Sequence, residues 1–375
     1  MTTEMMSSRE RILAALRGQD LDRIPWSPCI DGYFLGKVDQ VSGFRKIGAD
    51  AMLRHCFNFI GSAPFRISVP PPGKSMPWQI FQTQAGDETE LRYETPVGAL
   101  TERYKYNPES PNIPWSTKRR LEKVDDLKVL AWMCEQAEYV PFPALFEAAE
   151  KLIGDDGITT ISILGTPLLW LLNSEAMVDT FWYLYFDHTS EMEQLFDAGH
   201  RMLKRMCQAC AEGPGEVVIQ YENLSSTLCS PGIWEKYAPE WIKEYAQILH
   251  SGGKIYLQHD CGHLLAFGDK LARLALDGFV DVATPPTGTL PDLATARSLW
   301  GKDKFIMGGI DATAQVEKTP EQMKDYVQGF LKTMGEGRRM ALGTNDAVPK
   351  NATWETLQAI TEAVKSSGSF PLNPV

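Results

Sequence analysis

From about residue 158 onward, the sequence repeats one pattern: a short apolar run rich in β-branched residues, a polar loop with glycine, and a stretch of helical periodicity. Nearly continuous apolar runs are typical of parallel strands that are covered on both faces. A further strand is predicted near the start of the chain, within residues 22–31. The pattern predicts six strands in its own region, at residues 158–165, 216–223, 254–260, 278–284, 304–311 and 339–345.

The helical stretches between these runs have recognisable ends. Ser230 predicts an N-cap with Pro231 at the first helical position, and Thr319 with Gln322 predicts a capping box. No GxGxxG or GxxxxGK[ST] motif follows any predicted strand, which argues against an open nucleotide-binding sheet. We therefore predict an α/β fold in which residues 1–375 form a single (β/α)₈ TIM barrel domain.

Residues 65–130 depart from this pattern and predict an N-terminal β-rich insertion, or flap, on the barrel. The run from 91 to 106 predicts two strands around a Pro-Val-Gly turn, whereas residues 107–116 predict a loop. The aromatic residues of this region would either line a pocket for a flat ligand or form the small core of the flap itself. They are Trp78, Phe81, Tyr93, Tyr104, Tyr106 and Trp115.

Composition excludes several classes of protein. No run of 18 apolar residues is present, and the start of the chain predicts an amphipathic helix rather than a signal peptide, so we expect a cytoplasmic protein without a membrane partner. Seven irregularly spaced cysteines indicate reduced thiols. Cys207 and Cys210 form a CxxC, but they continue the apolar face of a predicted helix, and we therefore expect them in the core. A net charge of −11 without a Lys/Arg-rich run argues against nucleic acid as a partner. The oligomeric state stays open, a homodimer included.

A TIM barrel carries its active site at the C-terminal ends of its strands. Polar residues at these positions should therefore converge on one face of the barrel. They are Asp31, Glu222, Asn223, His259, Cys261, Asp311, Asn345 and Asp346.

The hexapeptide "QHDCGH" places His259 and Cys261 two positions apart, so that period-2 geometry directs both side chains to the same side of a strand. An imidazole and a thiolate joined by a carboxylate suit Zn²⁺, and we predict a zinc site completed by Glu222 or Asp346. Which carboxylate reaches the metal stays open. The alternative is that Cys261 is a small buried residue and His259 a hydrogen-bonded histidine without a metal.

Three stretches of the chain resemble the uroporphyrinogen decarboxylase superfamily. They are "SSRERILAALRGQDLDRIP", "SPGIWEKYAPEWIKEYAQILHSGGKIYLQHDCGH" and the closing segment that runs from "KFIMGGIDATAQVEKTPEQM" to "ALGTNDAVPKNATWETLQAI". The resemblance implies a (β/α)₈ barrel. It also implies one of two activities: decarboxylation of a porphyrinogen, or methyl transfer between a small molecule and a corrinoid carried on a separate protein.

Two departures from the family patterns separate these activities. The decarboxylases resemble one another in an arginine-rich segment after the first strand, but this chain has no arginine between Arg23 and Arg45. The thiol-directed methyltransferases add a third ligand, a cysteine, near the last strand, where this chain reads "GTNDAVP". A metal with fewer thiolate ligands is a harder Lewis acid, which suits an ether oxygen. The resemblance thus favours O-demethylation of a methoxylated small substrate, and we expect an aromatic one.

In this reading the acceptor is cob(I)alamin, a corrinoid cofactor supplied by a partner corrinoid protein. Asp31 or Asp311 would neutralise the charge on the leaving oxygen, and we place Asn223 with them among the catalytic residues. Gly308 and Gly309 are expected at the cofactor.

Three other readings stay open at the level of sequence. The first is a methylcobalamin-dependent methyltransferase that acts on a thiol or a folate. The second is a decarboxylase, which needs no metal. The third is a corrinoid- or porphyrin-binding protein that has kept the barrel without the chemistry.

Overall fold

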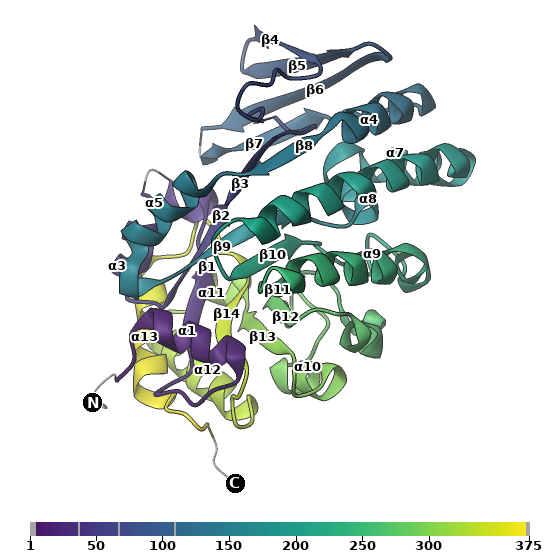
Figure 1. Cartoon of the computed structure of the whole chain (residues 1–375). Helices are drawn as coiled ribbons and strands as arrows, with labels where there is room; N and C mark the ends of the chain where they lie inside the picture. Colours follow the sequence, from purple (N-terminus) through teal and green to yellow (C-terminus); the bar gives the residue numbers. More distant parts are fainter. Residues whose placement is uncertain (1–4, 37, 67, 109, 373–375) are drawn as a thin grey trace.

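The computed structural model describes residues 5–36, 38–66, 68–108 and 110–372. Eight parallel strands form a barrel that is surrounded by helices (Figure 1), which confirms the predicted fold class. Hydrogen bonds link these strands in the order β1-β14-β13-β12-β11-β10-β9-β2. The strands are β1 Trp26–Cys29, β2 Ala51–Cys56, β9 Gly157–Leu164, β10 Val217–Tyr221, β11 Ile255–His259, β12 Gly278–Val282, β13 Phe305–Ile310 and β14 Met340–Ala347.

All six strands predicted after residue 157 are present, each within a few residues of its predicted bounds, and β1 lies within the predicted range 22–31. The predicted caps are also present: the hydroxyl of Ser230 accepts a hydrogen bond from the Ile233 amide, and Thr319 and Gln322 form the capping box. The helices are α1 Ser8–Arg17, α2 Gly32–Leu35, α3 Gln40–Ile47, α4 Val124–Gln136, α5 Pro143–Ile153, α6 Pro167–Trp170, α7 Val178–Asp187, α8 Thr189–Glu212, α9 Pro231–Ser251, α10 Leu293–Trp300, α11 Ala312–Glu317, α12 Pro320–Thr333 and α13 Trp354–Ser367.

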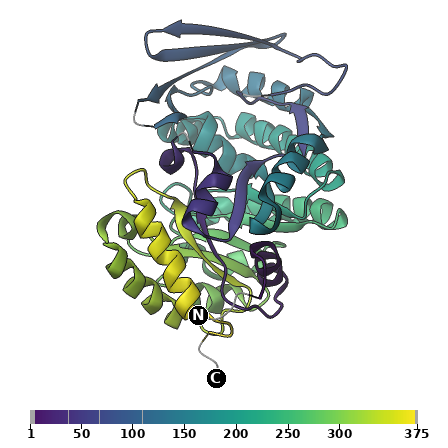
Figure 2. The ribbon, with the colours of Figure 1, turned by 90° about the vertical axis from the view of Figure 1, so that its left-hand side faces the viewer.

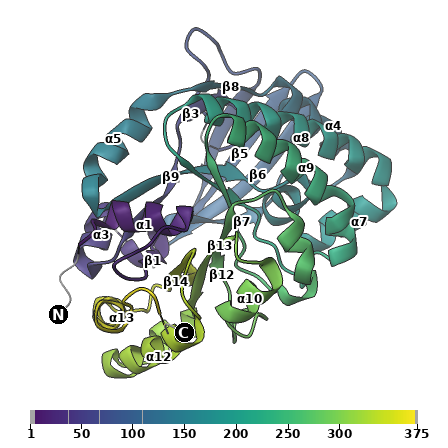
Figure 3. The same cartoon turned by 60° about the horizontal axis from the view of Figure 1, so that its bottom comes forward.

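Helix α1 covers the N-terminal end of the barrel, as seen in Figure 3, where that end is turned forward. Its apolar residues Ile12 and Leu16 belong to the same buried cluster as the inward-facing side chains of the barrel strands, among them Leu257 and Val280. The bottom of the barrel is therefore filled with side chains, and a site can open only at the opposite end.

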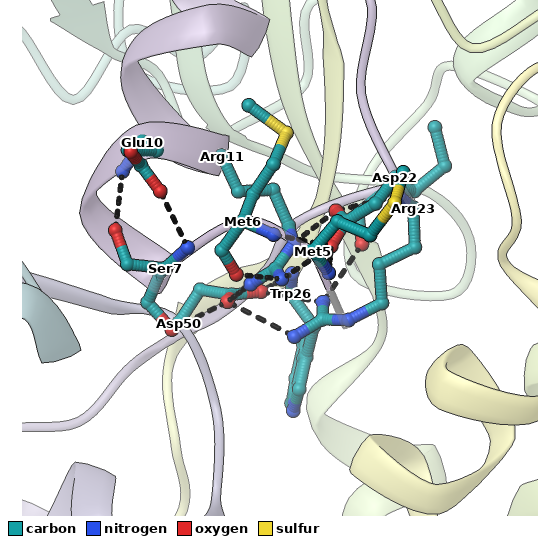
Figure 4. A network of polar contacts seen from close by, with 11 residues as sticks. Met5, Met6, Ser7, Glu10, Arg11, Asp22, Arg23, Trp26 and Asp50 are labelled. Carbon is teal, nitrogen blue, oxygen red and sulfur yellow. Dashed lines mark hydrogen bonds and ion pairs between the residues drawn. The ribbon is translucent and has the colours of Figure 1, made fainter. Parts of the chain in front are cut away.

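The seam between β1 and β2 is closed through Asp50. The backbone N–H of Asp50 donates to the carbonyl of Trp26 at 2.8 Å, and the Trp26 N–H donates back to the Asp50 carboxylate at 2.9 Å. The same carboxylate binds the guanidinium groups of Arg11, at 2.5 Å, and Arg23, at 2.7 Å (Figure 4). Burial by itself would raise the pKa of Asp50, but the two arginines hold it below its usual value.

An inserted region lies between β2 and β9. A four-stranded antiparallel sheet projects from one end of the molecule in Figure 2, and a two-stranded antiparallel pair, β3 with β8, lies at its base. The buried side chains of Leu91, Tyr93 and Leu100 pack one face of this sheet into the main core together with Leu130 of α4. The inserted strands are β3 Phe59–Ser62, β4 Gln79–Ala85, β5 Glu88–Thr95, β6 Gly98–Asn107, β7 Ser110–Lys118 and β8 Glu138–Pro141.

The two strands predicted around the Pro-Val-Gly turn are β5 and β6, but the prediction of a loop at residues 107–116 is wrong. Most of this stretch belongs to β7, which pairs with β6 so that Pro114 lies opposite Tyr106. Proline has no backbone N–H and cannot donate a hydrogen bond to a neighbouring strand. It is tolerated in β7 because β7 lies at the edge of the sheet.

The aromatic residues of the flap divide between core and surface. Trp78 and Tyr93 are buried, in agreement with a core of the flap, whereas Phe81, Tyr106 and Trp115 are exposed on the sheet. Within the described ranges, no helix is long and apolar enough to cross a membrane.

We predict that Asp50→Asn lowers the free energy of unfolding by about 3–5 kcal/mol, because it removes the charge of a carboxylate that two buried guanidinium groups share. Urea denaturation followed by circular dichroism measures this loss. A matched control is Asp20→Asn, which removes an exposed partner of Arg338 and should change stability by no more than about 0.5 kcal/mol. Equal effects of the two substitutions would contradict a role of Asp50 in closing the barrel.

Candidate functional site

His259, Cys261 and Asp346 come together at the C-terminal end of the barrel. One potential ligand atom from each residue lies within 4.8 Å of the other two. His259 is the last residue of β11 and is 3% exposed, Cys261 follows it in the loop, and Asp346 lies near the end of β14 with its side chain open to solvent. A nitrogen, a sulfur and an oxygen donor in this arrangement suit Zn²⁺, with an open side from which a substrate can approach.

The imidazole of His259 is held in place by a buried ion pair. Its Nδ1 atom lies 2.6 Å from Oδ2 of Asp281, and Nε2 lies on the side of Asp346, 3.9 Å from Oδ1. Arg54 of β2 binds both oxygens of Asp281, at 2.8 and 3.1 Å. An ionised Asp281 accepts a hydrogen bond from Nδ1–H of His259, and so Nε2 is the atom that is left to bind a metal.

The charges of the site favour an added cation. Burial by itself would raise the pKa of Asp281, but Arg54 and His259 lower it to about 2. Burial would lower the pKa of His259, yet Cys261 and Asp281 raise it well above its usual value. The surroundings of His259 therefore stabilise positive charge at the position where a metal ion would supply it.

Backbone irregularities bring the charged residues to this end of the barrel. An extra residue interrupts the pairing of β2 with β9 after Leu53, and another interrupts the pairing of β12 with β13 after Phe279. His55 and Asp281 lie within these bulges and have positive φ angles, 59° and 62°. Bulges of this kind redirect side chains, and residues other than glycine in this conformation are costly, by about 1–3 kcal/mol each.

Tyr221 and Asn223 complete the described surroundings of His259. The ring of Tyr221 lies 5.0 Å from that of His259, centroid to centroid. Asn223 follows β10 with a φ angle of 52°, and its Oδ1 accepts a hydrogen bond from the thiol of Cys261 at 3.7 Å. The predicted catalytic residue Asn223 thus lies beside the thiol, where it orients the sulfur.

Glu222, the other carboxylate considered as a ligand, is not a member of the group. It is completely buried, and its two oxygens accept hydrogen bonds from the backbone N–H and the hydroxyl of Thr166, at 2.6 and 2.7 Å. Burial raises the pKa of Glu222 to about 7, in spite of these two hydrogen bonds. Among the two carboxylates, the geometry thus brings Asp346 to His259 and Cys261.

Asp311 is also buried, in a network of hydrogen bonds. It accepts from the Thr313 amide as the N-cap of α11, from the Thr287 hydroxyl at 2.6 Å, and from the Asn345 side-chain amide at 3.0 Å. These bonds tie the loop after β12 to β13 and β14, next to Asp346. Asp311 therefore helps to position these loops. These hydrogen bonds of its carboxylate go to Thr287, Thr313 and Asn345 rather than to the three candidate ligands.

Gly308 and Gly309 lie within β13 and are closely surrounded. A Cβ atom at Gly308 would lie 2.4 Å from the Val282 carbonyl oxygen, and one at Gly309 would lie 2.2 Å from the ring of Phe330 on α12. Both have positive φ angles. Packing of β13 against its neighbours therefore requires glycine at both positions, and their expected contact with the cofactor stays a prediction. Asp31 lies half-buried in the loop between β1 and α2.

Four residues around His259 were not predicted from the sequence as members of the site: Arg54, His55, Tyr221 and Asp281. Asp281 had a signal that could have found it, since it is the one charged residue within the apolar run 278–284. The conformation that turns it toward His259 depends on the bulge, which the sequence pattern does not show.

Comparisons with known proteins agree with this architecture. The sequence signature of uroporphyrinogen decarboxylase (URO-D) matches residues 99–367. A search of curated sequences finds no match. Among solved structures, a methyltransferase from Methanosarcina mazei is similar over 96% of this chain and 99% of its own, with a TM-score of 0.63 and 13% identity.

More distant similarity extends to glycoside hydrolases. A Bacteroidetes-affiliated GH5 cellulase matches 60% of this chain and 76% of its own, with a TM-score of 0.38 and 10% identity. A GH5 xyloglucan-specific glucanase from a ruminal metagenomic library matches 62% and 80%, with a TM-score of 0.35 and 8% identity.

We predict that Asp281→Asn weakens Zn²⁺ binding about 10- to 100-fold, because an amide neither accepts the His259 proton as strongly nor neutralises Arg54. Competition with a chromogenic chelator measures the affinity. The chain offers a matched control in Asp277→Asn, which alters a second His–Asp pair, with His250, that is partly exposed. Unchanged affinity in Asp281→Asn would show that the pair with His259 does not support metal binding.

Glu222 makes stability depend on pH. Its pKa is about 7 in the folded protein, compared with 4.5 for an unperturbed glutamate. Folding at a pH between 4.5 and 7 is therefore accompanied by uptake of a proton. Stability from this group is full below pH 4.5 and falls as the pH rises toward 7, by up to about 3 kcal/mol. Urea denaturation at pH 5, 6 and 7 should show a steeper decline in the wild type than in Glu222→Gln; parallel slopes would refute this assignment.

Proposed function

The chain belongs to the uroporphyrinogen decarboxylase (URO-D) family, and from this premise we propose that it is a zinc-dependent methyltransferase. It takes a methyl group from a methoxylated aromatic substrate and transfers it to the cob(I)alamin of a separate corrinoid protein. In this reaction the bond between methyl and oxygen breaks, a bond between methyl and cobalt forms, and the oxygen leaves with its electron pair and acquires a proton.

The observation that carries the proposal is the group of His259, Cys261 and Asp346 at the open end of the barrel. One thiol, one imidazole and one carboxylate make a set of mixed donors, poorer in sulfur than a site with two cysteines. A metal with this set is a comparatively hard Lewis acid. The Methanosarcina methyltransferase, which has the same fold, is consistent with this class of reaction.

When bound, Zn²⁺ would polarise the ether oxygen and so assist the departure of a poor leaving group. His259, Cys261 and Asp346 would hold the ion. Asp281 fixes the ring of His259, and Arg54 fixes Asp281, so that the metal-binding nitrogen keeps its direction. The nucleophile comes with the partner, and the protein therefore needs an open barrel end rather than a nucleophilic side chain of its own.

Transfer to a thiol acceptor is less well supported. Besides Cys261, the thiol that interacts electrostatically with His259 and Asp346 is Cys29. Cys29 is outside the group of ligands, and burial raises its pKa far above the usual value, so its thiol stays protonated. The described group of ligands therefore contains one cysteine, Cys261.

Decarboxylation of a polycarboxylate is also less well supported. The guanidinium of Arg54 reaches the site, but both its contacts there go to Asp281, which neutralises it. Together with the absence of arginine between Arg23 and Arg45, this argues against a substrate that carries several carboxylates.

We expect the purified protein to contain about one zinc per chain, and a His259→Ala, Cys261→Ala double variant to contain none. With cob(I)alamin and 2-methoxyphenol, the wild type should form methylcobalamin, which absorbance spectroscopy detects, and the variant should not. Methyl transfer that persists in the metal-free protein would overturn the role of zinc. Release of carbon dioxide from an organic acid, or consumption of methylcobalamin with a thiol, would overturn the proposed direction of the reaction.

A further inference from the structure

The bulge in β2 brings two consecutive side chains to the same end of the barrel. In a regular strand, Arg54 and His55 would point to opposite faces. Here Arg54 turns inward to Asp281, and the extra residue with φ 59° at His55 directs the imidazole toward Tyr221. The backbone N–H of His55 is held by the hydroxyl of Ser162 at 3.1 Å, so this conformation is fixed by the neighbouring strand β9.

His55, Tyr221 and His259 form a row of three rings. The rings of His55 and Tyr221 are stacked, with centroids 5.1 Å apart and planes 27° apart. Tyr221 and His259 are 5.0 Å apart with planes at 32°. His259 is buried, Tyr221 is half-buried and His55 is exposed. The row therefore extends from the candidate metal ligand His259 to the exposed side chain of His55.

We propose that His55 and Tyr221 form the platform that binds the aromatic ring of the substrate, and that His55 selects aryl over alkyl methyl ethers. This inference rests on the proposed function. A substrate whose ether oxygen lies at the ligands His259 and Asp346 extends its remaining atoms toward solvent, along the row. A flat ring can pack against these rings, and aromatic pairs favour centroid separations of about 4.5–7 Å.

The strain at His55 supports a role in binding. Glycine adopts a positive φ without steric cost, whereas a histidine there is under strain, so backbone stability alone does not explain the residue. Three of the four described residues other than glycine with a positive φ, namely His55, Asn223 and Asp281, lie at the C-terminal end of the barrel around the metal ligands. Strain concentrated in this way is typical of functional sites.

Two substitutions separate the ring of His55 from its backbone conformation. His55→Asn keeps a residue suited to the positive φ and removes the ring, whereas His55→Phe keeps a ring. Phe57→Asn is the matched control, because Phe57 is an exposed aromatic residue of the same segment whose ring pairs with Phe59 rather than with the row. Calorimetric titration of the zinc-loaded proteins with 2-methoxyphenol and with 2-methoxyethanol, without any corrinoid, measures binding alone.

We expect His55→Asn to weaken binding of 2-methoxyphenol about two- to tenfold, the range that corresponds to the loss of one aromatic pair. Zinc content and binding of 2-methoxyethanol should not change, and His55→Phe and Phe57→Asn should bind 2-methoxyphenol like the wild type. Equal binding of 2-methoxyphenol by the wild type and His55→Asn would overturn the proposal. So would a loss of zinc from His55→Asn, which would indicate a structural role.

These outcomes separate the platform from the proposed function. Binding of 2-methoxyphenol that depends on the ring of His55, in a protein that transfers no methyl group, would support the platform and refute the methyltransferase activity. Methyl transfer from 2-methoxyphenol at the same KM and kcat in the wild type and His55→Asn would support the activity and overturn the platform.

Discussion

Closure of the barrel depends on the buried carboxylate of Asp50. Seven of the neighbouring strand pairs are joined by ladders of backbone hydrogen bonds, but β1 and β2 meet through Asp50, which exchanges two bonds with Trp26 and binds Arg11 and Arg23. The carboxylate of Asp22 also binds Arg11, and buried charges of this kind are stable only while they are paired. The network also joins α1 to this seam, so one carboxylate fixes both the ring of strands and the helix that fills its N-terminal end.

A second buried ion pair organises the opposite end. Arg54 lies on β2, only four residues after Asp50, which directly precedes that strand, and it binds Asp281 across the interior. The first pair stabilises the barrel, whereas the second orients an imidazole and needs two bulges to do so. The strand β2 thus has a structural charge at its beginning and a functional charge near its end, as expected of a fold that separates stability from activity along the strand axis.

The sequence predicted the regular parts of this structure well because hydrophobic periodicity and helix caps are local signals. The strands from β9 to β14, the caps at Ser230 and Thr319, and the pairing of His259 with Cys261 all follow from neighbouring residues. The missed features depend on contacts between distant segments. Edge position allowed proline in β7, and bulges turned His55 and Asp281 toward the site. The burial of Glu222 under Thr166 likewise separated two carboxylates that looked equivalent in sequence.

The site unites residues that are far apart in the order of synthesis. Arg54 lies in the second strand of the barrel, Asp281 in the sixth and Asp346 at the end of the eighth. On the ribosome, the group of His259, Cys261 and Asp346 cannot assemble until nearly all of β14 has been translated and the seam at Asp50 has closed. A nascent chain that ends just after "QHDCGH" therefore has a histidine and a thiol without the carboxylate of Asp346, and the complete group of three candidate ligands forms only with the complete barrel.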